Sequence, residues 1–132
     1  MVADPVDPGN KLREVAQNLS IPLARRHIFL CADQTKPKCA EREVTVESWD
    51  YLKRRLEELG IAKGENCVFR TKANCLRVCE QGPIAVVYPE GIWYAKVTPK
   101  RFERIAREHL LGGKPVTKWI VARNPLSETL KN

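Results

Sequence analysis

The cysteines place the strongest constraint on how this chain folds. The sequence has 132 residues and five cysteines, and four of them bracket two polar loops: Cys31 and Cys39 the first, Cys75 and Cys79 the second. Each loop follows an apolar run. If the two apolar runs are neighbouring strands, their loops present two thiolates each at one place. Four thiolates suit a soft metal centre such as zinc or an iron–sulfur cluster. The Cys-x3-Cys spacing of the second pair puts its sulfurs one helical turn apart, close enough to share one iron.

The spacing of these cysteines leaves the identity of the metal open. Structural zinc sites favour two Cys-x2–4-Cys pairs, whereas seven residues separate Cys31 from Cys39. The plant-type iron–sulfur pattern, Cys-x4-Cys-x2-Cys with a distant fourth cysteine, is absent from the sequence. From the residues alone, an iron–sulfur cluster and a zinc ion both remain as interpretations.

The fifth cysteine, Cys67, begins a second apolar run with Val68 and Phe69. Its distance from Cys75 repeats the seven-residue gap of the first pair, so a ligand set with Cys67 in place of Cys79 is conceivable. Free cysteine is more commonly a small buried residue, and the apolar neighbours favour that interpretation. The sequence has no Cys-x-x-Cys motif, so thioredoxin-style disulfide exchange lacks its usual signature.

The first half of the chain predicts two helices and a strand. Asn10 is expected to cap a short amphipathic helix. The run 27–31 is short and apolar, which predicts a buried strand. After a polar loop, a helix capped by Ser48 and closed by Gly60 is expected, with its apolar face on Trp49, Leu52, Leu56 and Leu59.

The second half of the chain predicts a strand, a hairpin and a helix. A strand is expected over 67–71, and the apolar runs 84–88 and 92–97 flank a tight turn as the two strands of a hairpin. Thr98 is a capping residue and Pro99 suits the first helical position, so the last helix is expected to begin there.

This order of elements indicates an α/β fold, a mixed sheet flanked by helices. The folded domain is expected over residues 26–116. Residues 1–25 are expected to form an N-terminal tail with the short helix. Residues 117–132 are expected to form a C-terminal arm, which either docks on the domain or stays loose.

Charge and hydropathy exclude several classes of protein. The net charge is +7, but the basic residues are interleaved with acidic ones, which favours a solvated basic surface over a nucleic-acid-binding arm. No stretch approaches the roughly 20 apolar residues that span a bilayer, and the N-terminus lacks the pattern of a signal peptide. A cytoplasmic location is therefore expected. Histidines 27 and 109 lie on apolar stretches and are expected to be core or helix-end residues. No catalytic motif stands out, so an enzyme is not expected.

Several segments together resemble one known family. They are the spacing Cys31-x7-Cys39-x35-Cys75-x3-Cys79, the pairs Gly82-Pro83 and Trp93-Tyr94, and the stretches 86–91, 108–110 and 113–116. These features resemble the thioredoxin-like [2Fe–2S] ferredoxins, and the same module looks like the small iron–sulfur subunit of respiratory complex I and of NAD-linked hydrogenases. The resemblance covers roughly residues 26–116.

This resemblance implies a thioredoxin-like fold and a soluble one-electron carrier. It also implies a [2Fe–2S] cluster whose metal ligands are Cys31, Cys39, Cys75 and Cys79. Some members of the family pair as homodimers. Thioredoxin-like folds carry a cis proline just before the central hairpin strand, and Pro83 takes the corresponding place.

The expected partners are redox proteins. The last helix carries four basic residues, which are either simply solvated or a docking face for an acidic partner: Lys100, Arg101, Arg104 and Arg107. Neither a membrane nor a nucleic acid is expected as a partner of such a carrier. The alternative function is a zinc-stabilised four-cysteine binding module with a basic surface.

Overall fold

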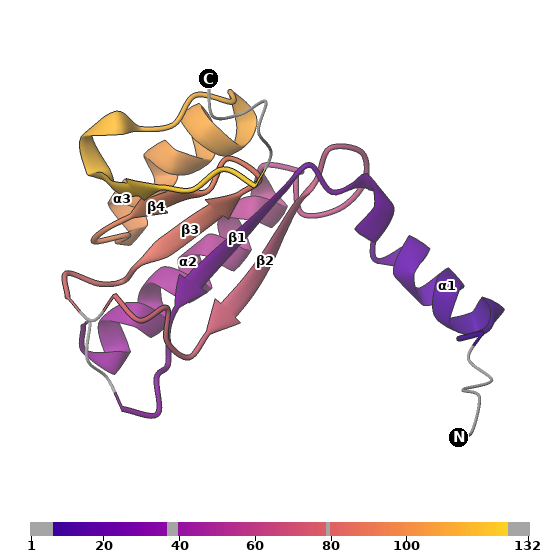
Figure 1. The fold of residues 1–132 in the computed structure, drawn as a ribbon, viewed down its shortest axis with the longest axis horizontal. Helices are drawn as coiled ribbons and strands as arrows, with labels where there is room; N and C mark the ends of the chain where they lie inside the picture. Colours follow the sequence, from indigo (N-terminus) through magenta and orange to yellow (C-terminus); the bar gives the residue numbers. More distant parts are fainter. Residues whose placement is uncertain (1–6, 37–39, 79, 127–132) are drawn as a thin grey trace.

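The computed structural model describes residues 7–36, 40–78 and 80–126. In this part of the chain five strands form one sheet in the order β2-β1-β3-β4-β5 (Figure 1). Strands β1 and β2 pair in parallel, and the other neighbouring pairs are antiparallel. The mixed sheet predicted from the sequence is confirmed, with strands β1 Arg26–Cys31, β2 Val68–Ala73, β3 Ala85–Tyr88, β4 Ile92–Tyr94 and β5 Ile120–Arg123.

The longer helices differ in how they relate to the sheet. The helix α2, Arg42–Glu58, and the helix α3, Pro99–Ile105, pack on one face of the sheet, and α3 continues as a π-helical turn, Ala106–Leu111. The helix α1, Asn10–Asn18, stands away from the sheet and buries none of its residues (Figure 1). No helix of the described residues is long and apolar enough to cross a membrane.

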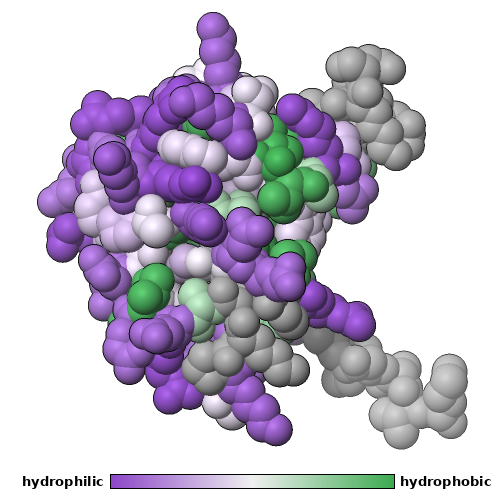
Figure 2. All heavy atoms as spheres, turned by 90° about the vertical axis from the view of Figure 1, so that its left-hand side faces the viewer, coloured by the Kyte–Doolittle hydropathy of each residue, from purple (hydrophilic) through white to green (hydrophobic). Residues whose placement is uncertain are grey.

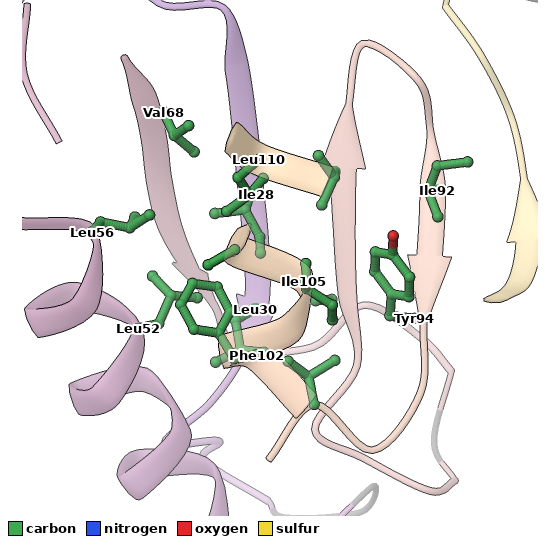
Figure 3. Packing of buried hydrophobic residues seen from close by; sticks show 14 of the residues in the cluster. Ile28, Leu30, Leu52, Leu56, Val68, Ile92, Tyr94, Phe102, Ile105 and Leu110 are labelled. Carbon is green, nitrogen blue, oxygen red and sulfur yellow. The ribbon is translucent and has the colours of Figure 1, made fainter. Parts of the chain in front are cut away.

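One hydrophobic core lies between the sheet and the helices α2 and α3 (Figure 3). Alternate residues of each strand point toward it, as the two-residue period of a strand requires. Removing such apolar surface from water provides the main favourable free energy of folding. The fully buried side chains include Ile28, Leu30, Leu52, Leu56, Tyr94, Phe102 and Ile105. Trp93 lies beside Tyr94 but packs with Cys31 and Ile84 in a second, smaller cluster on the other face.

The start predicted for the second helix is wrong. Helix α2 begins six residues before Ser48, which is buried inside the helix, and the Ser48 hydroxyl has no partner among the described residues. The cause is a tertiary contact. Thr45 Oγ1 donates to the Arg42 carbonyl and accepts the N–H of Asp33 at 3.0 Å, which ties the first turn of α2 to the loop after β1.

Other helix ends follow the sequence signals more closely. Gly60 has φ +73° directly after α2, and the Ile61 N–H returns to the Leu56 carbonyl at 3.1 Å, a helix-ending arrangement that needs a left-handed residue. The Thr98 hydroxyl caps α3, and Pro99 is its first residue. Helix α1 is preceded by Gly9, so the prediction that Asn10 caps it is wrong.

The hairpin also departs from its predicted length. The Gly82–Pro83 peptide is cis, which confirms the expectation for Pro83, and Tyr88–Pro89 is cis as well. Strand β4 ends at Tyr94, three residues earlier than predicted, because Lys96 has φ +50° and turns the chain toward the loop before β3. There the Lys96 N–H donates to the Gln81 carbonyl and the Val97 N–H donates to the Pro83 carbonyl.

The segment after residue 116 adds a strand to the sheet. Strand β5 pairs with β4, so this part of the predicted arm is docked. The Asn124 N–H donates to the Gly91 carbonyl at 2.8 Å, and Gly91 has φ +66°. A Cβ atom at Gly91 would lie 1.9 Å from the Asn124 carbonyl oxygen. The end of β5 therefore requires glycine at this turn.

A buried polar network joins the start of β1 to the hairpin turn and to the turn after α3. Arg26 pairs with Glu90 at 3.0 Å and donates to the Leu110 carbonyl. His109 is fully buried between Glu90 and the Tyr94 hydroxyl, which also accepts the N–H of Val116. The Tyr94 hydroxyl accepts from Val116 and has its own proton to donate to His109 Nδ1, an arrangement that fits a neutral ring with its proton on Nε2, toward Glu90. His109 is thus the core histidine that the sequence predicted.

We expect Gly91→Ala to destabilise the fold more than Gly64→Ala. Both glycines have positive φ, so either alanine strains the backbone by about 1 kcal/mol, but open space surrounds Gly64 and a carbonyl oxygen faces Gly91. Displacing β5 should cost roughly another 1–3 kcal/mol. Thermal unfolding followed by circular dichroism compares the two midpoints, and equal midpoints would contradict the tight contact between Gly91 and Asn124.

We expect the free energy of unfolding to fall as the pH drops from about 7 to 5. Burial lowers the pKa of His109 below its usual 6.5, so the unfolded chain takes up a proton that the folded chain refuses. Urea unfolding at several pH values measures this slope. His109→Gln should reduce this slope only in part. Burial also lowers the pKa of His27, so His27 still contributes to the slope in the variant. A slope unchanged by His109→Gln would show that this histidine is not held neutral.

Candidate metal centre

The two predicted ligand loops leave the sheet at the same edge. Because β1 and β2 are parallel, their carboxyl ends lie together, and Cys31 at the end of β1 pairs with Ala73 at the end of β2. The Ala32 N–H extends this pairing by donating to the Ala73 carbonyl at 3.0 Å. Cys75 follows two residues after Ala73, in the second loop. The fold therefore brings these two cysteine-bearing loops side by side.

Cys31 is held by a reciprocal pair of hydrogen bonds with Ile84. The Cys31 N–H donates to the Ile84 carbonyl at 3.0 Å, and the Ile84 N–H donates to Cys31 Sγ at 3.1 Å. Cys31 is buried, 1% exposed, and packs against Ile84 with Trp93 and Leu76 nearby. An N–H group aimed at sulfur stabilises negative charge on it, as a thiolate ligand requires.

Cys75 has a different setting at the surface. Its Sγ accepts the N–H of Arg77 at 3.2 Å, and Arg77 has φ +71°, which turns the chain back over the sulfur. The Cys75 side chain is exposed and borders a surface hollow of about 230 Å³ that Thr35, Lys36 and Asn74 also line. The hollow thus lies between the two loops, where a group shared by both would bind.

Three side chains fix the course of the first loop. Asn74 Oδ1 accepts the N–H of Thr35 at 2.8 Å and so ties the first loop to the residue before Cys75. The Arg42 guanidinium donates to the carbonyls of Gln34, at 3.1 Å from Nε, and Thr35. Thr45 holds the backbone of the same loop from α2, as described above. Sequence reasoning missed these residues, because a hydrogen bond between distant loops leaves no spacing pattern in the chain.

The charges beside the loops are partly balanced. Asp33 lies 3.3 Å from Lys72 and 3.6 Å from Arg42, measured between nitrogen and carboxylate oxygen. One carboxylate therefore faces two cations. These three side chains are about half exposed, so the pairs contribute little to the stability of the fold.

The predicted ligands Cys39 and Cys79 lie outside the described residues. Among the residues that the structure does describe, no three His, Cys, Asp or Glu side chains gather as a metal site. Two of the four predicted sulfurs, those of Cys31 and Cys75, can therefore be placed, and each accepts a backbone N–H.

Cys67 lies at the opposite end of the sheet from Cys31. Val68 pairs with Arg26, so Cys67 is level with residue 25 and six steps along the strands from Cys31, on the order of 20 Å. Its side chain is fully buried, its Sγ lies 3.7 Å from the Ser20 carbonyl, and burial raises the pKa of the thiol. This is the setting of an inert buried cysteine.

The site suits an iron–sulfur cluster by the chemistry of its donors. Thiolate sulfur is the preferred ligand of such clusters, and hydrogen bonds to the sulfurs and exclusion of solvent tune their reduction potentials. Cys31 and Cys75 supply the sulfur, Ile84 and Arg77 supply the N–H groups, and Trp93 shields one side. The two histidines are engaged elsewhere: Thr71 bonds His27 at 2.7 Å, and His109 lies in the core.

Comparisons with known proteins agree with this chemistry. No protein-family model matches the chain. A 2Fe-2S ferredoxin of Clostridium pasteurianum is 33% identical over 95 residues, which cover 71% of this chain and 93% of that protein. A 2Fe-2S ferredoxin of Aquifex aeolicus (strain VF5) is 29% identical over 107 residues, which cover 74% of this chain and 90% of that protein.

Solved structures show the same likeness in three dimensions. The structure of a thioredoxin-like [2Fe–2S] ferredoxin from Aquifex aeolicus superimposes with a TM-score of 0.63 at 25% sequence identity. The match covers 79% of this chain and 98% of that one. Ferredoxins are electron carriers and not enzymes. On these grounds the chain belongs to the thioredoxin-like [2Fe–2S] ferredoxin family and is an electron carrier.

Proposed function

We propose that this protein carries one electron at a time on a [2Fe–2S] cluster whose ligands are Cys31, Cys39, Cys75 and Cys79. The observation that carries the proposal is the position of Cys31, at the end of β1, and Cys75, in the loop after β2, at the same end of the sheet, each with a backbone N–H donated to its sulfur. The remote, buried position of Cys67 supports a ligand set that leaves it out.

The bound cluster supplies the chemistry, since it takes up and releases one electron without bond making. The chain supplies the setting. Ile84 and Arg77 donate N–H groups to two ligand sulfurs, which favours the more negative reduced state. Trp93 and Leu76 keep water from the side of Cys31. Asn74 holds the two loops together by accepting the N–H of Thr35.

We expect Cys75→Ala and Cys79→Ala to abolish normal cluster assembly, because each removes one proposed ligand. Cys67→Ala is the matched control, since it removes a buried thiol about 20 Å along the strands from Cys31. The control should keep the visible absorption spectrum and the electron paramagnetic resonance signal of the reduced protein.

Two outcomes would contradict the proposal. If Cys67→Ala bleaches the protein and Cys79→Ala does not, the ligand set is wrong. If protein purified without oxygen is colourless and contains one zinc per chain, the site is a zinc-stabilised binding module instead. Iron and zinc analysis of the same samples separates these outcomes.

We further propose that the redox partner presents an acidic surface and meets this protein in the cytoplasm. Around the two loops the described charges nearly balance, with Lys36, Arg42, Lys72 and Arg77 against Asp33, Glu41 and Glu80, so a bound oxidised cluster of charge −2 would leave the mouth of the site close to neutral. The basic character lies on the surrounding surface, which includes the side of α3 that carries Arg104. The whole chain carries a net charge of +7, of which an oxidised cluster with four thiolates would cancel only two units. Transient redox complexes use small interfaces and gain speed from complementary charge. Five cysteines and a buried thiol suit a compartment that keeps thiols reduced.

We expect the rate of electron transfer with such a partner to fall as salt is added, because salt screens the attraction. The screening length is about 10 Å at 0.1 M salt, so most of the change should occur below physiological salt. Stopped-flow reduction by a candidate partner across a salt series measures the effect. A rate that is flat or rises with salt would remove the acidic partner and leave the electron-carrier function in place.

A further inference from the structure

A second surface hollow, of about 390 Å³, lies beside helix α3. It is lined by Thr98, Lys100, Arg101, Arg104 and Trp119, and we call it the Trp119 hollow. The guanidinium carbons of Arg101 and Arg104 lie over the Trp119 ring, at 4.8 Å and 5.4 Å from its centre. The two cations are therefore stacked on one aromatic side chain, although they come from a different part of the sequence.

The Trp119 hollow holds positive charge that the fold does not neutralise. Arg104 pairs with Glu108, but no carboxylate among the described residues lies within ion-pair distance of Lys100 or Arg101. Arg101 instead donates to the Ala95 carbonyl at 3.2 Å, which leaves part of its guanidinium free while the side chain stays in place. Among the residues that the structure describes, none of those lining the hollow is acidic. A guanidinium that is already positioned loses little freedom when it binds an anion.

The hollow lies at the same edge of the sheet as the cysteine loops. Strand β4 runs parallel to β1, since each pairs antiparallel with β3, so Tyr94 at its end lies at the edge where Cys31 lies. Ala95, which accepts the hydrogen bond of Arg101, packs in the small cluster with Cys31 and Ile84. A partner seated in the hollow is thus linked to Cys31 through the hydrogen bond of Arg101 to Ala95 and the packing of Ala95 against the Cys31 cluster.

Figure 2 shows the face of the molecule seen from the left of Figure 1. That face is mainly hydrophilic, with hydrophobic side chains gathered chiefly toward the right-hand side of the view. A partner that docks in the Trp119 hollow meets Lys100, Arg101 and Arg104 and gains from matched charge, as is usual for transient redox complexes.

We propose that the Trp119 hollow docks a carboxylate-rich segment of the acidic redox partner. The carboxylates would bind Lys100 and the free donors of Arg101, whose planar guanidinium matches the geometry of a carboxylate. Trp119 would shield one side of the two arginines from solvent. This inference rests on the proposed function, because it locates the docking point for the acidic partner.

A binding experiment tests the hollow without electron transfer. Hexaglutamate is titrated into the ¹⁵N-labelled protein at low salt, and the amide signals of residues 98–104 and the indole N–H of Trp119 are followed. We expect shifts that saturate and that vanish in Lys100→Gln/Arg101→Gln. Shifts that instead spread evenly over the basic surface, or a short oligothymidylate that shifts the same signals at lower concentration than hexaglutamate, would overturn the proposal.

A kinetic experiment tests whether the hollow guides an electron acceptor. The reduced protein is oxidised by anionic ferricyanide and, separately, by cationic hexaamminecobalt(III), at about 0.01 M and at higher ionic strength. Lys100→Gln/Arg101→Gln should slow ferricyanide roughly three- to tenfold at low salt and should not slow the cobalt complex, because it removes local positive charge. The control is Lys11→Gln/Lys63→Gln, which removes the same charge from two exposed lysines outside the hollow, one on helix α1 and one in the loop before β2.

The two double variants decide between a local and a global effect. If both slow ferricyanide equally, only net charge matters and the Trp119 hollow is not a docking point. The visible spectrum of each variant is recorded first. A spectrum without iron–sulfur bands in the wild-type protein would defeat the proposed cluster, whereas a normal spectrum with no hexaglutamate binding would defeat the hollow alone.

Discussion

The parallel pairing of β1 and β2 is the constraint on which the site depends. Two parallel strands need a long connection, and α2 supplies it across one face of the sheet. This crossover sends both strands in the same direction, so the loops after Cys31 and Ala73 emerge together. An antiparallel pair would have put the two loops at opposite edges. The hydrophobic face of α2, through Leu52 and Leu56, therefore helps to position the strands that lead to Cys31 and Cys75.

The neighbouring strand β3 contributes to the same edge through its backbone. Ile84 precedes β3 and exchanges two hydrogen bonds with Cys31, one of them to the sulfur. The side chain of Cys31 thus takes the place of a backbone carbonyl in the antiparallel ladder. A ligand fixed in this way has few alternative orientations. Its neighbour Cys75 sits on a loop held by Asn74, and the two settings differ in exposure to water.

At the opposite edge of the sheet a buried polar network stabilises the fold. Arg26, Glu90 and His109 bring charge into the core, where it is paired or neutralised by hydrogen bonds. Breaking such a network is costly because each member would leave a buried polar group without a partner. The network links the start of β1, the hairpin turn and the helix after α3, and Gly91 lets β5 close against the same turn. This network and the Gly91 turn therefore stabilise the end of the sheet opposite the cysteine loops.

The sequence by itself determined much of the architecture. Apolar runs predicted β1, β2 and the hairpin to within a few residues, Thr98-Pro99 located the start of α3, and Gly60 located the end of α2, because these signals act through local geometry. The cysteine spacing and the segments around Gly82-Pro83 and Trp93-Tyr94 identified the family that the comparisons with known ferredoxins then showed. They also named Cys31 and Cys75, which the fold places at the end of β1 and in the loop after β2.

The tertiary structure decided what depends on contacts between distant residues. The early start of α2, the docking of β5 beside Gly91, the tie between Thr35 and Asn74, and the stacking of Arg101 on Trp119 all join segments far apart in the chain. It also placed Cys67 at the opposite end of the sheet from Cys31, although its spacing to Cys75 copies that of a ligand pair. Spacing along a chain constrains only near neighbours. Which distant groups meet is fixed by strand register and by the packing of helices on the sheet.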